Sequence, residues 1–376
     1  MFIQKKEMTS RERYMAIYEN REVDRPAFRL WGFTPGMGVI HPSYEPVCKL
    51  AEEVTDTVCG SGSAFNFYGG IHSDKNVSRS REKTDDPRWD IIYTVFHTKR
   101  GDLVQRDMVS NFGEPGYIME HAAKDIDDLL AIIDMPYEPY NFSSEGFFNA
   151  EKWIGDRGIT MFDLPHPGYA VQVLTGSENL AYFSVDDREA VDYAVSTYAN
   201  RVVEHAKRAV ENGVKGVFGW CGPELLTPPL LNKQDFRDFC VKYDKKVIDV
   251  IKNAGSHFWV HCHGKVADLL DDFIYMGVDV LNPLEPPKNG DVDLEKVVEK
   301  YGNRIGLEGN VEIQDIIQAE PEVLLSLTEQ CVAAGKKSGR FILCPSAGFM
   351  EYIRPEERYI SNLQLFLKEG YRLINE

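Results

Sequence analysis

The sequence predicts an α/β fold, a single (β/α)8 barrel, from the number of its strands, their composition and the helices between them. Several candidate strands are uninterrupted apolar runs, such as residues 216–220 and 341–343, which is typical of parallel strands buried on both faces. An open doubly wound sheet is the rival fold, but no glycine-rich dinucleotide loop follows the first strand. The eight candidate strands end near Trp31, Gly60, Leu164, Trp220, His263, Leu284, Gly309 and Pro345.

Helices fit before and between these strands. An N-terminal helix is expected from Thr9 to about Asn20, because Thr9 and Glu12 have the spacing of a capping box. Amphipathic patterns predict the other helices, because apolar residues recur at the spacing of one helical face. These helices cover residues 189–212, 234–253, 265–275, 294–300, 321–336 and 355–373.

The segment between the second and third strands is too long for a plain crossover. Residues 89–96 and 103–107 have the composition of two strands, and Gly101-Asp102 is typical of a turn between them. We therefore expect a β-hairpin insertion at about residues 80–125 that decorates the top of the barrel. With this insertion, residues 1–376 are expected to form one domain.

Composition excludes several classes of partner and location. The formal charge is -17 and no basic run occurs, so a nucleic-acid partner is not expected. No stretch of about 18 apolar residues indicates a membrane span, and the first residues lack an apolar signal core. The seven cysteines include no CxxC pair, which favours reduced thiols and a cytoplasmic location.

The run His261-Cys262-His263-Gly264 at the end of the fifth strand carries the strongest chemical signal. Side chains alternate along a strand, so His261 and His263 project to the same side. Imidazole is the commonest neutral metal ligand, and two imidazoles at one strand end can bind a divalent ion. The alternative is a pair of histidines held by ordinary hydrogen bonds.

Other strand ends bring carboxylates, a thiol and aromatic rings to the same rim of the barrel, where such barrels place their working residues. Zinc binds histidine nitrogen, cysteine sulfur and carboxylate oxygen, and Glu285 and Glu308 also end strands. Alternatively, the glutamates pair with Lys or Arg and Cys344 is a packed thiol. Aromatic residues at a cavity mouth suit a planar apolar substrate. The predicted metal ligands are His261, His263, Cys344 and Glu224. The predicted substrate-binding residues are Trp31, Phe33, Phe67, Tyr68, Trp220, Glu285 and Asn310.

A set of short segments, in a fixed order along nearly the whole chain, resembles the uroporphyrinogen decarboxylase superfamily. The resemblance implies a (β/α)8 barrel and one of two activities. One branch decarboxylates uroporphyrinogen without a cofactor, and the other moves methyl groups to or from a cobalt corrinoid, usually with zinc. The segments are Asp24-Arg25-Pro26, Pro228-Pro229-Leu230-Leu231, His261-Cys262-His263-Gly264, Gly277-Val278-Asp279, Leu307-Glu308-Gly309-Asn310 and Phe341-Ile342-Leu343.

The stretch after the first strand favours the methyltransferase branch. The decarboxylase branch has an arginine-rich stretch there for its polyanionic substrate, whereas residues 28–36 contain one arginine and three aromatic residues. The methyltransferase branch binds zinc through His-x-Cys after the fifth strand and a later cysteine. His261 matches that histidine, and His263 replaces the first cysteine. The later cysteine aligns with Ala347, so Cys344 is the nearest thiol.

The resemblance thus implies a methyltransferase that uses zinc and a corrinoid carried by a partner protein. We expect a small methylated donor, and the aromatic rim favours an aryl methyl ether over methanol, methylamines or a thiol. If zinc is absent, His261 or Glu224 is the expected catalytic acid that protonates the leaving oxygen. The alternatives are decarboxylation of a tetrapyrrole and a barrel that binds a ligand without catalysis.

Overall fold

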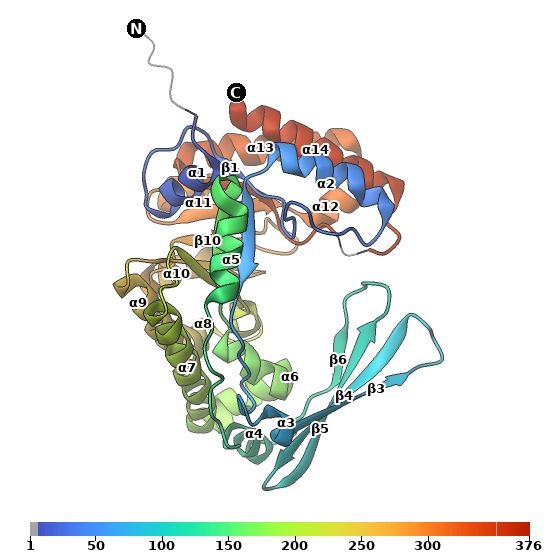
Figure 1. Ribbon diagram of the computed structural model, residues 1–376, viewed down its shortest axis with the longest axis vertical. Helices are drawn as coiled ribbons and strands as arrows, with labels where there is room; N and C mark the ends of the chain where they lie inside the picture. Colours follow the sequence, from blue (N-terminus) through green and yellow to red (C-terminus); the bar gives the residue numbers. More distant parts are fainter. Residues whose placement is uncertain (1–6, 351) are drawn as a thin grey trace.

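Eight parallel strands form the central sheet of the protein, in a computed structural model that describes residues 7–350 and 352–376 (Figure 1). Their order in the sheet is β1-β12-β11-β10-β9-β8-β7-β2. The predicted fold class is therefore confirmed. The strands are β1 (Ala27–Phe28), β2 (Thr57–Ser61), β7 (Gly158–Asp163), β8 (Val217–Cys221), β9 (His257–His261), β10 (Val280–Asn282), β11 (Gly306–Val311) and β12 (Phe341–Pro345).

The edge strands β1 and β2 are connected through Asp56 rather than through a ladder of backbone bonds. The Asp56 amide donates to the carbonyl of Phe28 at 2.6 Å, and the Phe28 amide donates to Asp56 Oδ2 at 2.9 Å. Asp56 is 1% exposed and forms ion pairs with Arg13 and Arg25. These pairs compensate the cost of burying a carboxylate, so the two edges can meet.

Helices surround the sheet (Figure 1). The predicted capping box at Thr9 and Glu12 is present and begins α1. Helix α6, which the sequence analysis did not predict, has a kink at Gly176. The helices are α1 (Ser10–Tyr18), α2 (Glu45–Val54), α3 (Ser73–Asn76), α4 (Ile126–Ile133), α5 (Glu145–Ile154), α6 (Pro167–Asp186), α7 (Arg188–Glu211), α8 (Lys233–Phe236), α9 (Lys242–Asn253), α10 (Leu270–Met276), α11 (Leu294–Tyr301), α12 (Ile313–Gln318), α13 (Pro321–Gly335) and α14 (Glu357–Asn375).

Short helical turns connect several elements. The π-helical turn η4 (Arg237–Val241) joins α8 to α9. The helix predicted at residues 234–253 is therefore one continuous segment with a local change of winding. The 3-10 turns are η1 (Pro42–Tyr44), η2 (Gly155–Arg157), η3 (Pro223–Leu226), η5 (Ala267–Leu269) and η6 (Lys336–Ser338). No helix in residues 7–350 and 352–376 is both long and apolar enough to span a membrane.

The insertion between β2 and β7 is a four-stranded antiparallel sheet in the order β3-β4-β5-β6. The predicted hairpin is its central pair, but Thr98 pairs with Gly101, so the turn residues are Lys99 and Arg100, two positions earlier than expected. The outer strand β3 was not predicted, because its sequence is polar and nearly all exposed. Figure 1 shows this sheet projecting from the barrel beside α3 and α4. The four strands are β3 (Val77–Lys83), β4 (Trp89–Thr98), β5 (Gly101–Ser110) and β6 (Tyr117–Glu120).

Two apolar cores stabilise the barrel. The larger core lies between the sheet and its helices, and the smaller one fills the inside of the barrel. Tyr14 and Ile17 of α1 belong to the inner core with Trp259 and Val280, so α1 packs against one end of the barrel. The carboxyl ends of the strands lie at the other end, where the candidate site is found.

Candidate functional site

A cavity of about 860 Å³ lies at the carboxyl ends of the strands. Its walls are largely aromatic, and eight residues predicted for the site line it. Another cavity, of about 590 Å³, is lined by Asp24, Glu376 and the start of β12, and none of the described residues that line it is a histidine or cysteine. The predicted residues in the larger cavity are Trp31, Phe33, Phe67, Tyr68, Trp220, Glu224, His261 and His263.

His261 is the last residue of β9 and its side chain reaches the cavity although it is only 6% exposed. Its Nδ1 lies 2.6 Å from Oδ1 of Asn282 on β10. An amide oxygen can only accept, so Nδ1 carries the proton and Nε2 keeps a lone pair. Burial, and secondarily His263, lower the pKa of His261 to about 4. The ring is therefore neutral at pH 7.

His263 is held in the same way by a carboxylate. Its Nδ1 lies 2.7 Å from Oε1 of Glu285, and the Gly264 amide donates to the other oxygen at 2.6 Å. Burial lowers the pKa of His263, but the hydrogen bond to Glu285 and the negative charges of Glu285, Glu224 and Glu312 together outweigh burial. The pKa is therefore raised above 6.5. The two rings, hereafter the mouth pair, lie edge to face with centroids 4.4 Å apart.

The mouth pair fits a metal by its hydrogen bonding. Metal-binding histidines usually donate their second ring nitrogen to an oxygen, which fixes the ring and leaves the other nitrogen to the metal. Asn282 and Glu285 supply these oxygens for His261 and His263. Glu224 adds a carboxylate to the cavity wall, positioned by its hydrogen bond from the Gly222 amide at 3.1 Å.

Cys221 is a thiol of this cavity that the sequence analysis did not select. It ends β8, directly opposite His261 in the strand register, and its side chain is exposed to the cavity. The cavity walls shield the Cys221 thiol from water. This burial, together with the negative charge of Glu224, raises the pKa of Cys221 to about 12. The set of two imidazoles, a carboxylate and a thiol matches the ligand types of zinc. Within residues 7–350 and 352–376 these atoms do not form a group of three within 4.8 Å, so metal binding requires side-chain rotation.

Cys344, a predicted zinc ligand, lies elsewhere. It is 0% exposed and does not line the cavity, because β12 continues to Pro345 and leaves Cys344 below the strand end. Burial, with Glu308 nearby, raises its pKa well above the usual range. Its surroundings are those of the packed thiol that was the alternative.

Glu285 and Asn310, predicted to bind substrate, do not line the cavity. Glu285 is 6% exposed and lies behind His263, whose ring it orients. Asn310 lines a different cavity, of about 410 Å³, and its backbone amide donates to Cys331 Sγ at 3.3 Å. The sequence placed both residues at strand ends, but it did not show which way each side chain turns.

Arg29 and Asp163 line the cavity and were not selected from the sequence. Arg29 pairs with Glu308 at 2.9 Å and stacks over Trp31 and Trp259. Asp163 is the last residue of β7, and burial raises its pKa to about 6 although Arg29 opposes this. Its position at a strand end was the signal that could have identified it.

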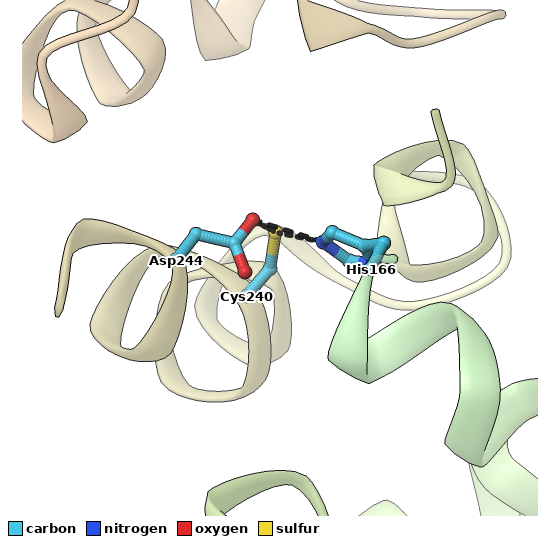
Figure 2. A group of neighbouring side chains, drawn as sticks. All are labelled: His166, Cys240 and Asp244. Atoms are coloured by element: carbon cyan, nitrogen blue, oxygen red, sulfur yellow. Dashed lines mark hydrogen bonds and ion pairs between the residues drawn. The ribbon is translucent and has the colours of Figure 1, made fainter. Parts of the chain in front are cut away.

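A second group of ligand-type side chains lies beside the cavity and consists of His166, Cys240 and Asp244 (Figure 2). Asp244 Oδ2 lies 2.9 Å from His166 Nε2 and 3.0 Å from Cys240 Sγ. In the part of the chain that the structure describes, this His166 cluster is the one group of three whose ligand atoms lie within 4.8 Å. It joins the start of α6 to η4 and α9, segments far apart in the chain, so it could not be predicted from the sequence.

Hydrogen bonding makes the His166 cluster a poor metal site in this arrangement. His166 is the N-cap of α6, and its Nδ1 accepts from the Tyr169 amide at 3.0 Å. Nε2 therefore carries the proton and donates to Asp244. A metal on Nε2 would move this proton to Nδ1 and break the cap, so the cluster is better suited to a structural role.

Comparisons with known proteins agree with this fold. A uroporphyrinogen decarboxylase (URO-D) from Parasynechococcus marenigrum (strain WH8102) is 20% identical over 303 residues, which is 74% of this chain and 82% of that protein. Another from Prochlorococcus marinus (strain MIT 9515) is 23% identical over 276 residues, 69% of this chain and 72% of that protein. The structure of a methyltransferase from Methanosarcina mazei has a TM-score of 0.60, covers 97% of this chain and 98% of its own, and is 14% identical, which establishes a shared fold.

The family model for uroporphyrinogen decarboxylase matches residues 168–358, just over half of the 376 residues. This range begins in α6, contains the strand ends that carry Glu224, His261 and His263, and reaches α14. The resemblance inferred from short segments is thereby confirmed. The chain belongs to the uroporphyrinogen decarboxylase family.

Proposed function

We propose that the protein is a methyltransferase that moves a methyl group from an aryl methyl ether to the cobalt of a corrinoid carried by a partner protein. The observation that supports this most is the mouth pair, in which Asn282 and Glu285 hold Nδ1 of each ring and leave both Nε2 atoms to a metal. The shared fold with a methyltransferase from Methanosarcina mazei is consistent with it.

His261, His263 and Glu224 would hold the zinc, and Cys221 is the thiol closest to them in the strand register. Bound there, zinc would act as a Lewis acid on the leaving oxygen. The aromatic walls of the cavity, including Trp31 and Trp220, hold and orient the planar donor. The methyl carbon leaves the ether oxygen for the reduced corrinoid, and the bonding electron pair stays on oxygen as a phenolate.

The charges in the cavity disfavour the alternative, decarboxylation of uroporphyrinogen. That substrate carries many carboxylates and needs several cationic side chains. Among the described residues that line the cavity, Arg29 is the one Lys or Arg, and Glu308 already pairs with it. Asp163 and Glu224 add negative charge to the same walls. The cavity is therefore suited to an aromatic donor with little negative charge.

The direct test mixes the purified protein with a Co(I) corrinoid protein and guaiacol and follows methyl-cobalt by absorbance. We expect methyl-cobalt formation that depends on the protein, and about one zinc per chain by elemental analysis. Absence of methyl-cobalt from every ether, alcohol, amine and thioether donor would overturn the proposal. Turnover of uroporphyrinogen without a metal would establish the alternative instead.

A further inference from the structure

Asp163 is an unpaired carboxylate in the wall of an aromatic cavity. Its side chain is exposed to the cavity at the end of β7. Among residues 7–350 and 352–376, no side chain or amide forms a hydrogen bond or ion pair with its carboxylate. A carboxylate that is neither paired nor directed into bulk solvent has unused capacity to accept hydrogen bonds.

Arg29 is the cation whose charge acts on Asp163, but it does not form an ion pair with it. Arg29 donates to Glu308 at 2.9 Å, and its guanidinium lies 4.5 Å from the Trp31 ring and 5.2 Å from the Trp259 ring. Two aromatic faces and a buried carboxylate thus fix this arginine in place. Burial in the wall raises the pKa of Asp163 to about 6, which leaves it mostly ionised at pH 7.5.

Gly60 on the neighbouring strand makes room for the carboxylate. A Cβ at position 60 would lie 2.7 Å from Asp163 Oδ2, closer than such atoms approach in proteins. Gly60 pairs with Met161, and the β2–β7 pairing continues to Ser61 and Phe162, so the backbone leading to Asp163 is held beside Gly60. The glycine therefore allows the carboxylate to remain in its place in the wall.

We propose that Asp163 is a specificity-determining residue that accepts a hydrogen bond from a ring hydroxyl of the aromatic donor and excludes donors with a carboxylate at that position. The identity of the donor class rests on the proposed function. The chemistry of the wall is independent of it, because an ionised carboxylate beside aromatic faces attracts a hydrogen-bond donor and repels an anion. A neutral arene without a hydroxyl would leave the carboxylate unpaired.

Three arenes that differ by single groups test this on the isolated protein at pH 7.5. Guaiacol has a methoxyl and a hydroxyl, veratrole has a second methoxyl in place of the hydroxyl, and 2-methoxybenzoate has a carboxylate in place of the hydroxyl. Binding is measured by quenching of tryptophan fluorescence, since Trp31, Trp220 and Trp259 line the cavity. We expect guaiacol to bind at least about tenfold more tightly than either of the others, because a site built for a hydroxyl rejects the analogue that lacks it.

Variants separate the carboxylate from the cavity. Asp163→Leu should lower the affinity for guaiacol to that for veratrole. The affinity for veratrole should not change, which would also show that the cavity is intact. Asp163→Asn should raise the affinity for 2-methoxybenzoate relative to that for guaiacol. Gly60→Ala keeps Asp163 but displaces its carboxylate. It should therefore lower the affinity for guaiacol, as Asp163→Leu does.

Equal binding of guaiacol and veratrole by the natural protein, or an unchanged preference in Asp163→Leu, would overturn the assignment. These measurements need neither corrinoid nor zinc. If the binding preference is present but no methyl-cobalt forms with any donor, the proposed function fails and the role of Asp163 stands. If methyl-cobalt forms from veratrole and guaiacol alike and their affinities are equal, the function stands and the role of Asp163 fails.

Discussion

The mouth pair and the His166 cluster use histidine in opposite ways. In the mouth pair, Nδ1 of each ring donates to an oxygen, so a metal can replace any proton on Nε2 without breaking these hydrogen bonds. In the His166 cluster, Nδ1 accepts from the Tyr169 amide and Nε2 donates to Asp244. Although the ligand atoms are closer together in the His166 cluster, the mouth pair can bind a metal through Nε2 and keep the hydrogen bonds that orient its rings. Tautomer, and not proximity alone, therefore decides which group suits a metal.

The backbone explains the difference. His166 precedes Pro167 at the start of α6, where unpaired amides require an acceptor. His261 and His263 follow a strand, where the neighbouring strand end supplies Asn282 and Glu285 as acceptors. The same side chain thus becomes an acceptor at a helix start and a donor at a strand end.

Removing a ring of the mouth pair should have the largest effect. His261→Ala takes away one of three or four metal ligands, so we expect zinc to fall from about one per chain to near zero. The rate of methyl-cobalt formation should fall by at least about 100-fold. Elemental analysis and the absorbance assay measure the two effects.

The matched control is His166→Asn, because asparagine is also a good N-cap. We expect its zinc content to equal that of the natural protein. If His166→Asn loses zinc and His261→Ala keeps it, the assignment of the two groups is reversed.

Breaking the His166 cluster should lower stability without loss of metal. Asp244→Ala removes the acceptor of two buried hydrogen bonds, from His166 and from Cys240. We expect the free energy of unfolding to fall by about 2–3 kcal/mol, as for the loss of hydrogen bonds to a buried charge. Urea denaturation measures this value. A loss of zinc in the folded variant would show that the cluster binds metal.

Weakening the support of the mouth pair should reduce metal affinity moderately. Glu285→Gln keeps an oxygen near His263 Nδ1 but removes the negative charge that strengthens this bond. We expect zinc affinity to fall by about tenfold, measured by competition with a chelator. Unchanged affinity would mean that Glu285 does not orient a metal ligand.

A third buried histidine, His205, shows what happens without a polar partner on Nε2. Its Nε2 is buried and unpaired, and burial, with Arg208 adding to it, lowers its pKa to about 4. The unfolded chain takes up the proton near pH 6.5 and the folded chain does not, so stability is complete above pH 6.5 and falls as the pH drops toward 4. When the pH is lowered from 7.5 to 5.5, His205 should reduce the free energy of unfolding by about 1.4 kcal/mol.

The check compares the natural protein with His205→Phe by urea denaturation at both pH values. The variant should lose less stability on acidification by about that amount, whatever its stability at pH 7.5. Equal losses in the two proteins would show that His205 is not held neutral by the fold.

Local patterns in the sequence determined much of this protein. The capping box at Thr9, the parallel strands and the two histidines on one side of a strand end depend on neighbours within a few residues, and each is found as predicted. The insertion was only partly predicted, because β3 is a polar edge strand whose pairing with β4 supplies what its own sequence lacks.

Contacts between distant segments decided the rest. Cys344 is fully buried close to Arg29 and Glu308, and Asn310 lines a different cavity. The His166 cluster joins residues more than 70 positions apart, and the unpaired state of Asp163 depends on Arg29 being bound to Glu308. Sequence alone determined which chemical groups reach the strand ends, because alternation along a strand is local. Only the tertiary structure decided their partners and protonation, because those depend on which other segments pack beside them.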